Sequence, residues 1–212
     1  YEQDFSKHAP NDAVPRIRKL WNNIPAQLAK KNKKFIYGLI REGARAKEYE
    51  LAMLWLTDCG LVHKVQRVTT PNLPLKAYED LKAFKLFLVD IGLLSCMTGL
   101  RQQTLLDGND LFKEFKGALT EQYVLQQLKT LKGVQTYYWT AERGTAEVDF
   151  IIDNGSGIIP IEVKAEANLQ AKSLKVYREK FQPKLSIRTS MANYRKEDWL
   201  LNLPLYAIEM IR

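Results

Sequence analysis

The sequence predicts an α/β protein, in the α+β arrangement, with two domains. Its 212 residues and 46% hydrophobic content allow one large or two small packed cores. Two observations carry the prediction. Helical periodicity dominates the first 60 residues and leads into a β-turn-β segment, and a later helix is followed by three β-type runs, a second helix and a last strand. We expect a linker at residues 1–15, a first domain at 16–101 and a second at 102–212.

The first domain begins with helices. Residues 1–15 are polar, contain two prolines and show no periodicity, which is typical of a linker. An amphipathic helix follows, because apolar residues recur at i, i+3, i+4 and i+7 in the series Ile17, Leu20, Trp21 and Ile24; Pro25 should end it or begin its next turn. Residues 35–41 and 48–59 predict two further helices, and Gly60 is suited to the end of the second.

Two strands, at residues 61–68 and 84–90, complete this half around a proline-rich turn. Helix, short helix, helix, strand, turn and strand is the order of a winged helix-turn-helix, whose last helix can enter the DNA major groove. Arg45 and Lys47 begin that helix. Winged helices also dock on proteins, so this alternative stays open.

Positive charge concentrates before that helix. Residues 15–47 hold ten Lys or Arg side chains and one acid, Glu42, within a chain of net charge +8. Such density fits a nucleic-acid backbone, and a solvated helix face is the alternative. The candidate DNA contacts are Lys31, Lys33, Lys34, Arg45 and Lys47.

The second domain is predicted to start with a helix at residues 112–131. Glu121 lies on its apolar stripe with Ala118, Leu125 and Leu128, and a carboxylate there needs a partner. The aromatic run at 134–139 predicts a strand and residues 169–181 predict a helix. We expect the last strands at 185–189 and 205–211.

A β-hairpin between these helices carries the chemistry. Apolar β-type runs at residues 148–152 and 158–163 flank the turn sequence D-N-G-S-G. Alternation along a strand places Glu147 with Asp149 on one face, and Glu162 with Lys164 on one face of the partner strand. Buried carboxylates need a partner, either Lys164 or a divalent cation. A solvated sheet face with ordinary cross-strand ion pairs is the alternative.

The spacing Asp149, Glu162 and Lys164, with Glu121 on the preceding helix, resembles the PD-(D/E)xK nuclease superfamily. Val148 stands where the proline of that name would be. The resemblance implies an αβββαβ restriction-endonuclease-like core and Mg²⁺ or Mn²⁺ held by Asp149, Glu162 and Glu121. Lys164 would stabilise the attacking water or the phosphate during DNA cleavage, and Glu147 would lie behind the metal ligands. A nuclease fold without catalysis remains the alternative.

The chain as a whole is similar to the C-terminal part of a bacterial and archaeal family of AAA-type P-loop ATPases. The motifs L-W-L-T-D-C-G-L-V-H-K-V, L-F-L-V-D-I-G-L-L, G-A-L-T-E-Q-Y-V, A-E-V-D-F and I-P-I-E-V-K carry this resemblance. It implies a winged-helix segment followed by a nuclease-like domain of unknown function. Thr120 departs from the bulky residue usual before Glu121. The N-terminal ATPase domain would be a partner outside this chain, since the sequence holds no G-x(4)-G-K-[ST] motif and begins with Tyr1.

The composition of the chain argues against several classes of protein and of site. Two histidines make a histidine-based metal site or triad a poor fit, and no apolar run is long enough to span a bilayer. Cys59 and Cys96 are expected as buried free thiols in a reducing compartment, the cytoplasm. We expect DNA and the ATPase domain as partners and no membrane association. An oligomer is compatible with the sequence.

Overall fold

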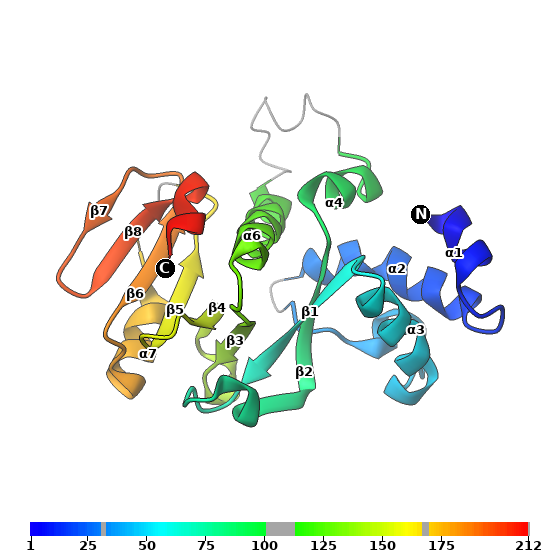
Figure 1. Cartoon of the computed structure of the whole chain (residues 1–212), viewed down its shortest axis with the longest axis horizontal. Coiled ribbons are helices and arrows are strands. Elements are labelled where there is room, and N and C mark those ends of the chain that lie inside the picture. Colours follow the sequence, from blue (N-terminus) through cyan, green and yellow to red (C-terminus); the bar gives the residue numbers. More distant parts are fainter. Residues whose placement is uncertain (31–32, 101–112, 167–169, 212) are drawn as a thin grey trace. The chain divides into compact units, whose positions relative to one another are not determined.

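The computed structural model of the chain describes residues 1–30, 33–100, 113–166 and 170–211 (Figure 1). They form a mixed α/β structure in which eight strands make one mixed sheet. The chain divides into two compact units. The first unit comprises Tyr1–Lys64 and Phe84–Asn109, and the second comprises Val65–Ala83 and Asp110–Arg212.

The first unit is mainly helical. Its elements are α1 (Glu2–His8), α2 (Val14–Leu28), the 3-10 turn η1 (Tyr37–Leu39), α3 (Ala46–Asp58) and α4 (Ile91–Met97). The apolar stripe predicted for α2 is buried, with Ile17, Leu20 and Ile24 fully inaccessible. Pro25 lies inside α2 and does not end it. The helix finishes three residues later, so Pro25 perturbs only its last turn.

The segment at residues 1–15, expected as a linker without periodicity, contains the helix α1 (Glu2–His8) and the start of α2. Phe5 on α1 is fully buried, and its ring meets Trp21 and Trp55 edge to face with centroids 5.5 Å from each. One aromatic anchor therefore holds a helix too short to show clear periodicity. Packing against α2 and α3, not local pattern, determines its structure.

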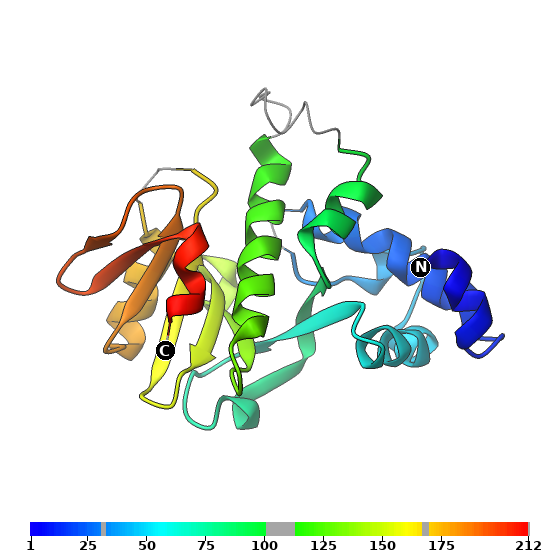
Figure 2. The ribbon, with the colours of Figure 1, turned by 45° about the horizontal axis from the view of Figure 1, so that its top comes forward.

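The second unit contains most of the sheet, whose strand order is β2-β1-β3-β4-β5-β6-β8-β7 (Figures 1 and 2). The strands are β1 (Val62–Val68), β2 (Glu79–Leu88), β3 (Thr136–Thr140), β4 (Glu147–Asp153), β5 (Ile158–Val163), β6 (Ser186–Ser190), β7 (Arg195–Lys196) and β8 (Leu200–Pro204). Neighbours β3–β4, β4–β5 and β7–β8 are antiparallel, whereas β1–β3, β5–β6 and β6–β8 are parallel.

Helices α6 (Lys113–Thr130) and α7 (Lys172–Phe181) cover opposite faces of the sheet (Figure 2). On the α7 face, Trp139 is buried and meets Tyr177 and Phe181 edge to face at centroid distances of 5.3 and 5.6 Å. Burial raises the pKa of the Tyr177 phenol, and burial followed by the Glu79 carboxylate raises the pKa of Tyr137 to about 12. Both phenols therefore stay neutral to a higher pH than an exposed tyrosine does.

The far half of the β1–β2 hairpin belongs to the second unit. Gln66, Arg67 and Val68 pair in parallel with β3, and Val68 and Leu75 are buried in the core beneath α7. Arg67 forms an ion pair with Asp80 and donates to the Thr140 hydroxyl at 3.2 Å. This half of the hairpin is an edge of the sheet, so it does not project as the free wing expected of a winged helix.

Two further expectations differ from the structure. The segment predicted as a last strand at 205–211 forms the 3-10 helix η5 (Leu205–Met210), and β8 (Leu200–Pro204) precedes it. Cys59 and Cys96 are exposed, because Cys59 follows the end of α3 and Cys96 lies on the outer side of α4. No helix in the described ranges combines the length and hydropathy that crossing a bilayer requires.

Phe5→Ala tests whether α1 is part of the first unit. Removal of this ring should lower the free energy of unfolding by about 3–5 kcal/mol, because the cavity between Trp21 and Trp55 cannot refill. Urea unfolding followed by tryptophan fluorescence measures the loss. Tyr1→Ala is the control, because Tyr1 is 61% exposed on the same helix start. Equal unfolding curves for the two variants would mean that α1 is not anchored.

Candidate functional site

The predicted hairpin is confirmed as the antiparallel pair β4–β5. Phe150 pairs with Ile161, and the ladder runs to Asp153 opposite Ile158. The turn closes by a bond from the Asn154 N–H to the Gly157 carbonyl at 3.3 Å. Gly155 adopts φ 83°, a conformation that a side chain would disfavour. The far, open end of this hairpin holds the predicted acidic residues.

Asp149 lies where β4 is irregular. The β3–β4 register shifts between Tyr137 and Trp139, so one extra β4 residue is accommodated around Asp149. A bulge of this kind re-aims a side chain. The Asp149 carboxylate Oδ2 accepts a hydrogen bond of 2.8 Å from the Val163 N–H on β5. The carboxylate is therefore held between the ends of β4 and β5, one residue from Glu162.

Glu162 is the buried charge of the site. Its side chain is almost inaccessible, with 3% of the residue exposed, and its Oε1 lies 2.5 Å from the Lys164 ammonium. The other oxygen, Oε2, is buried and has no hydrogen-bond partner. A carboxylate oxygen in this state carries an uncompensated desolvation cost. Lys164 is about one-third exposed, so this ion pair reaches from the buried strand to solvent.

A row of buried polar residues continues from Glu162 across the sheet. Arg188 on β6 is in register with Glu162, and Asn202 on β8 is in register with Arg188. Leu200 belongs to the apolar cluster beneath α7, and alternate residues of a strand share a face. Glu162, Arg188 and Asn202 therefore lie on the α7 face. Arg188 and Asn202 are 1% and 0% exposed.

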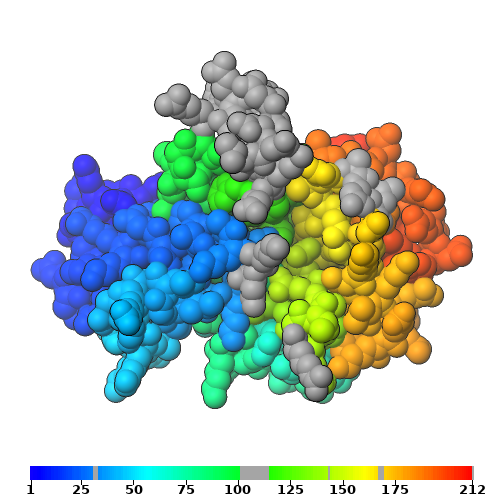
Figure 3. Space-filling model, turned by 180° about the vertical axis from the view of Figure 1, so that it is seen from behind, coloured from blue at the N-terminus to red at the C-terminus, as the bar shows by residue number. Residues whose placement is uncertain are grey.

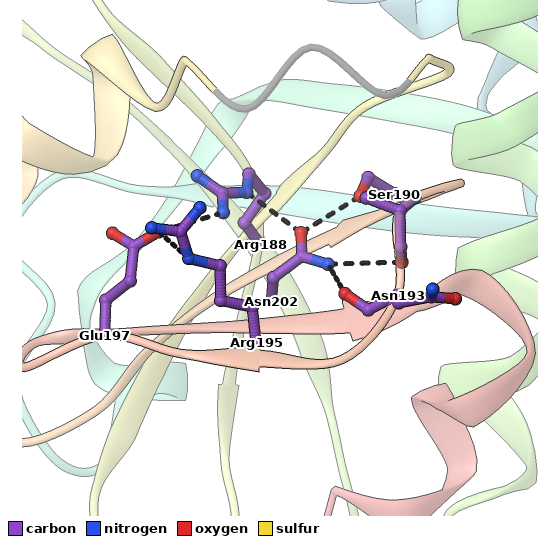
Figure 4. A network of polar contacts seen from close by, with 7 residues as sticks. Arg188, Ser190, Asn193, Arg195, Glu197 and Asn202 are labelled. Carbon is purple, nitrogen blue, oxygen red and sulfur yellow. Dashed lines mark hydrogen bonds and ion pairs between the residues drawn. The ribbon is translucent and has the colours of Figure 1, made fainter.

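Sequence reasoning missed Arg188 and Asn202. Arg188 lies in the mostly polar strand S-I-R-T-S, and Asn202 is the one polar residue of the apolar strand L-L-N-L-P. The presence of these polar residues within short strands could be seen in the sequence. However, the parallel pairings that align the two residues with Glu162 depend on long-range contacts, which periodicity cannot reveal. The network around Asn202 is shown in Figure 4.

The other predicted acids take different positions. Glu121 is 6% exposed on α6, the helix that covers the face opposite α7. Glu147 begins β4, opposite Thr140. Within the described ranges, no three acidic, histidine or cysteine side chains are grouped so that they could hold a metal ion. The structure thus pairs Glu162 with Lys164 and ties the Asp149 carboxylate to the backbone of the neighbouring Val163, and it does not add Glu121 as a third ligand.

The predicted DNA-contacting residues belong to the first unit. Arg45 precedes α3 and Lys47 lies in its first turn, and both are exposed. Lys33 and Lys34 are half-buried. Lys31 lies outside the described residues. Arg41 forms an ion pair with Glu48 beside the start of α3, which offsets part of the positive charge there.

Two family models match separate parts of the chain. Residues 1–104 match a domain of unknown function, DUF8612, and residues 116–207 match a second domain of unknown function, DUF4143. No curated protein sequence and no solved structure matches the chain. These likenesses carry no activity, so function has to be argued from the residues themselves.

Lys164→Met tests whether Lys164 compensates the buried charge of Glu162. The variant should lose about 1–3 kcal/mol of stability, because it leaves a buried carboxylate without its cation. The double variant Glu162→Gln, Lys164→Met should recover much of that loss, since it removes the charge as well. Urea unfolding of the two variants measures the difference. If the single and double variants lose the same stability, Lys164 does not compensate the desolvation cost of the buried Glu162 carboxylate.

Proposed function

We propose that the second unit binds one divalent cation, Mg²⁺ or Mn²⁺, between Asp149 and Glu162 and cleaves phosphodiester bonds of DNA. The observation that carries this proposal is the buried Glu162 Oε2, which lacks a hydrogen-bond partner, on a strand whose next residue, Val163, binds the Asp149 carboxylate through its N–H. Carboxylate oxygens are the ligands that hard cations prefer. The residues present therefore fit the cation that the nuclease resemblance implies.

Each residue of the site has a defined part in this proposal. Asp149 and Glu162 hold the cation, and the Val163 N–H fixes the Asp149 carboxylate through its other oxygen. The bound cation would act as a Lewis acid toward the phosphate and its attacking water. Lys164, already beside Glu162 and partly exposed, would stabilise the negative charge that develops on the phosphate. Glu147, two residues before Asp149 on β4, remains a candidate that could contact the cation through a water molecule, whereas Glu121 lies on the helix of the opposite face.

The first unit supplies DNA affinity in this proposal. Its basic segment at residues 15–47 and the exposed Arg45 and Lys47 offer cations to a phosphate backbone. The resemblance to the C-terminal region of AAA-type ATPases adds an ATPase domain as the partner that would regulate or position this region. The likeness of both parts of the chain to domains of unknown function is compatible with that assignment.

A non-catalytic module is the second candidate. Glu162 already has a cation at 2.5 Å in Lys164, and the described residues offer no third acidic ligand near it. In this alternative the ion pair is structural, and the region binds DNA or protein for its ATPase. Buried ion pairs occur in proteins without any catalytic role. The Glu162–Lys164 pair is therefore sufficient to explain the buried carboxylate in this alternative.

Metal binding and DNA cleavage by the purified chain separate the two candidates. Titration calorimetry with Mn²⁺, and incubation of plasmid DNA with Mg²⁺ or Mn²⁺, should show one metal site and metal-dependent cutting. Glu162→Gln and Asp149→Asn should each abolish cutting and weaken Mn²⁺ binding at least tenfold, because each removes a charged ligand. Lys164→Ala should abolish cutting but leave Mn²⁺ binding intact or tighter.

Glu166→Gln is the matched control, because this glutamate is exposed two residues beyond Lys164. It should bind Mn²⁺ and cut DNA as the unmodified protein does. Absence of a metal site in the unmodified protein would reject the catalytic proposal and leave the non-catalytic module. Cutting that survives both acid substitutions would come from another site or from contamination.

Replacement of Lys31, Lys33 and Lys34 by Ala tests the basic segment. If these side chains contact phosphates, DNA binding should weaken about equally for all sequences, and the slope of log affinity against log salt should flatten by up to about 3. Fluorescence anisotropy at several salt concentrations measures the slope. Lys76, Lys82 and Lys132 are exposed and provide a triple control of equal charge change. An unchanged slope would remove the three lysines from the interface.

A further inference from the structure

The segment between β6 and β8 is held from inside the fold. Residues 191–194 follow the carboxyl end of β6, and β7 (Arg195–Lys196) pairs back on β8. We refer to residues 191–196 as the 191–196 loop. Because β5 and β6 are parallel, their carboxyl ends lie at the same edge of the sheet. The loop therefore begins at the edge that carries Glu162 and Lys164.

Asn202 anchors this loop with its whole side-chain amide (Figure 4). Its Nδ2 donates to the Asn193 carbonyl at 2.8 Å and the Ala192 carbonyl at 3.3 Å. Its Oδ1 accepts from Arg188 Nε and from the Ser190 hydroxyl, each at 2.9 Å. A fully buried amide with four bonds fixes the backbone of the loop.

A second anchor holds the other end of the loop. The Glu197 carboxylate lies 3.5 Å from Arg195 Nε and 3.6 Å from Arg188 Nη2. The Glu197 N–H donates to the Leu200 carbonyl at 2.8 Å and closes a tight turn between β7 and β8. Trp199 in that turn lies against Arg178 of α7, whose guanidinium carbon is 5.0 Å from the ring centroid.

Several side chains of the 191–196 loop, which these two anchors hold in place, are exposed to solvent. Met191 is 68% and Tyr194 60% exposed, and both residues of β7 are exposed cations. Figure 3 shows the orange stretch of the chain, to which the 191–196 loop belongs, on the surface of the second unit. The fixed backbone of this loop adds no buried apolar area to the core. A fixed backbone does lower the entropy cost of binding a ligand, because the exposed aromatic ring and the two cations are already held in place.

We propose that the 191–196 loop is a contact surface for single-stranded nucleic acid, with Tyr194 stacking on an unpaired base and Arg195 and Lys196 contacting the flanking phosphates. An exposed ring beside cations is the combination that binds single strands with little sequence preference. The surface ion pair of Arg195 with Glu197 is weak enough to exchange for a phosphate. This inference rests on the proposed function, in which DNA is the partner, and adds that the DNA bound at this loop is single-stranded.

Anisotropy of fluorescent oligonucleotides in EDTA tests this surface without any contribution from a metal. Probes are a single strand of mixed sequence and the matching duplex, and the variants are Tyr194→Ala and Arg195→Ala with Lys196→Ala. Tyr194→Ala should weaken single-strand binding between about 5-fold and 100-fold and duplex binding much less. The double variant should weaken binding of both probes and flatten the salt slope by up to about 2. Tyr206→Ala is the matched control, because Tyr206 is a 75% exposed aromatic of the same unit.

Each outcome has a distinct meaning. Selective loss with Tyr194→Ala and none with Tyr206→Ala supports the loop surface. If the unmodified protein binds DNA and the loop variants bind equally well, the inference is wrong while the DNA partner stands. If the unmodified protein binds neither probe at low salt, both the inference and the DNA partner are wrong, and a protein partner is favoured. Circular dichroism confirms that the variants keep their fold.

Discussion

The buried negative charge of Glu162 on β5 is the constraint on which the candidate site depends. A carboxylate that is 3% exposed has lost its hydration and needs positive charge or hydrogen bonds in return. Lys164 meets one oxygen from the same strand, and the other oxygen has no hydrogen-bond partner. The site is therefore half compensated by the protein itself. In the proposed function, a divalent cation meets this second oxygen.

The sheet explains why the charge lies there. Parallel pairing of β5, β6 and β8 aligns Glu162, Arg188 and Asn202 in one row, and the irregularity in β4 turns Asp149 toward the same strand end. Open α/β sheets commonly bind ligands at the carboxyl ends of parallel strands. The amide of Asn202 then connects this row to the exposed 191–196 loop. One set of buried polar residues thus links a candidate site to a candidate surface.

Local patterns predicted much of this arrangement, and long-range pairing determined the rest. The stripe of α2 and the β4–β5 hairpin with its glycine turn followed from spacing alone. The helix α1 did not, because its stability comes from Phe5 between two tryptophans. The far half of the β1–β2 hairpin joins the sheet through pairing with β3, which sequence order could not show. Glu121 was expected beside the other acids because of a family resemblance, but it lies on α6, and no three acidic side chains of the described residues are grouped as metal ligands.

Diffraction from crystals of the protein grown with Mn²⁺, collected where manganese scatters anomalously, shows whether Glu162 binds a cation. A bound Mn²⁺ should give one anomalous peak at about 2.0–2.2 Å from Glu162 Oε2 and from a carboxylate oxygen of Asp149, with the Lys164 ammonium displaced or turned toward solvent. Absence of a peak at these carboxylates, with Lys164 still paired to Glu162 at saturating Mn²⁺, would rule out the cation site. Glu162 would then be a structural half of an ion pair.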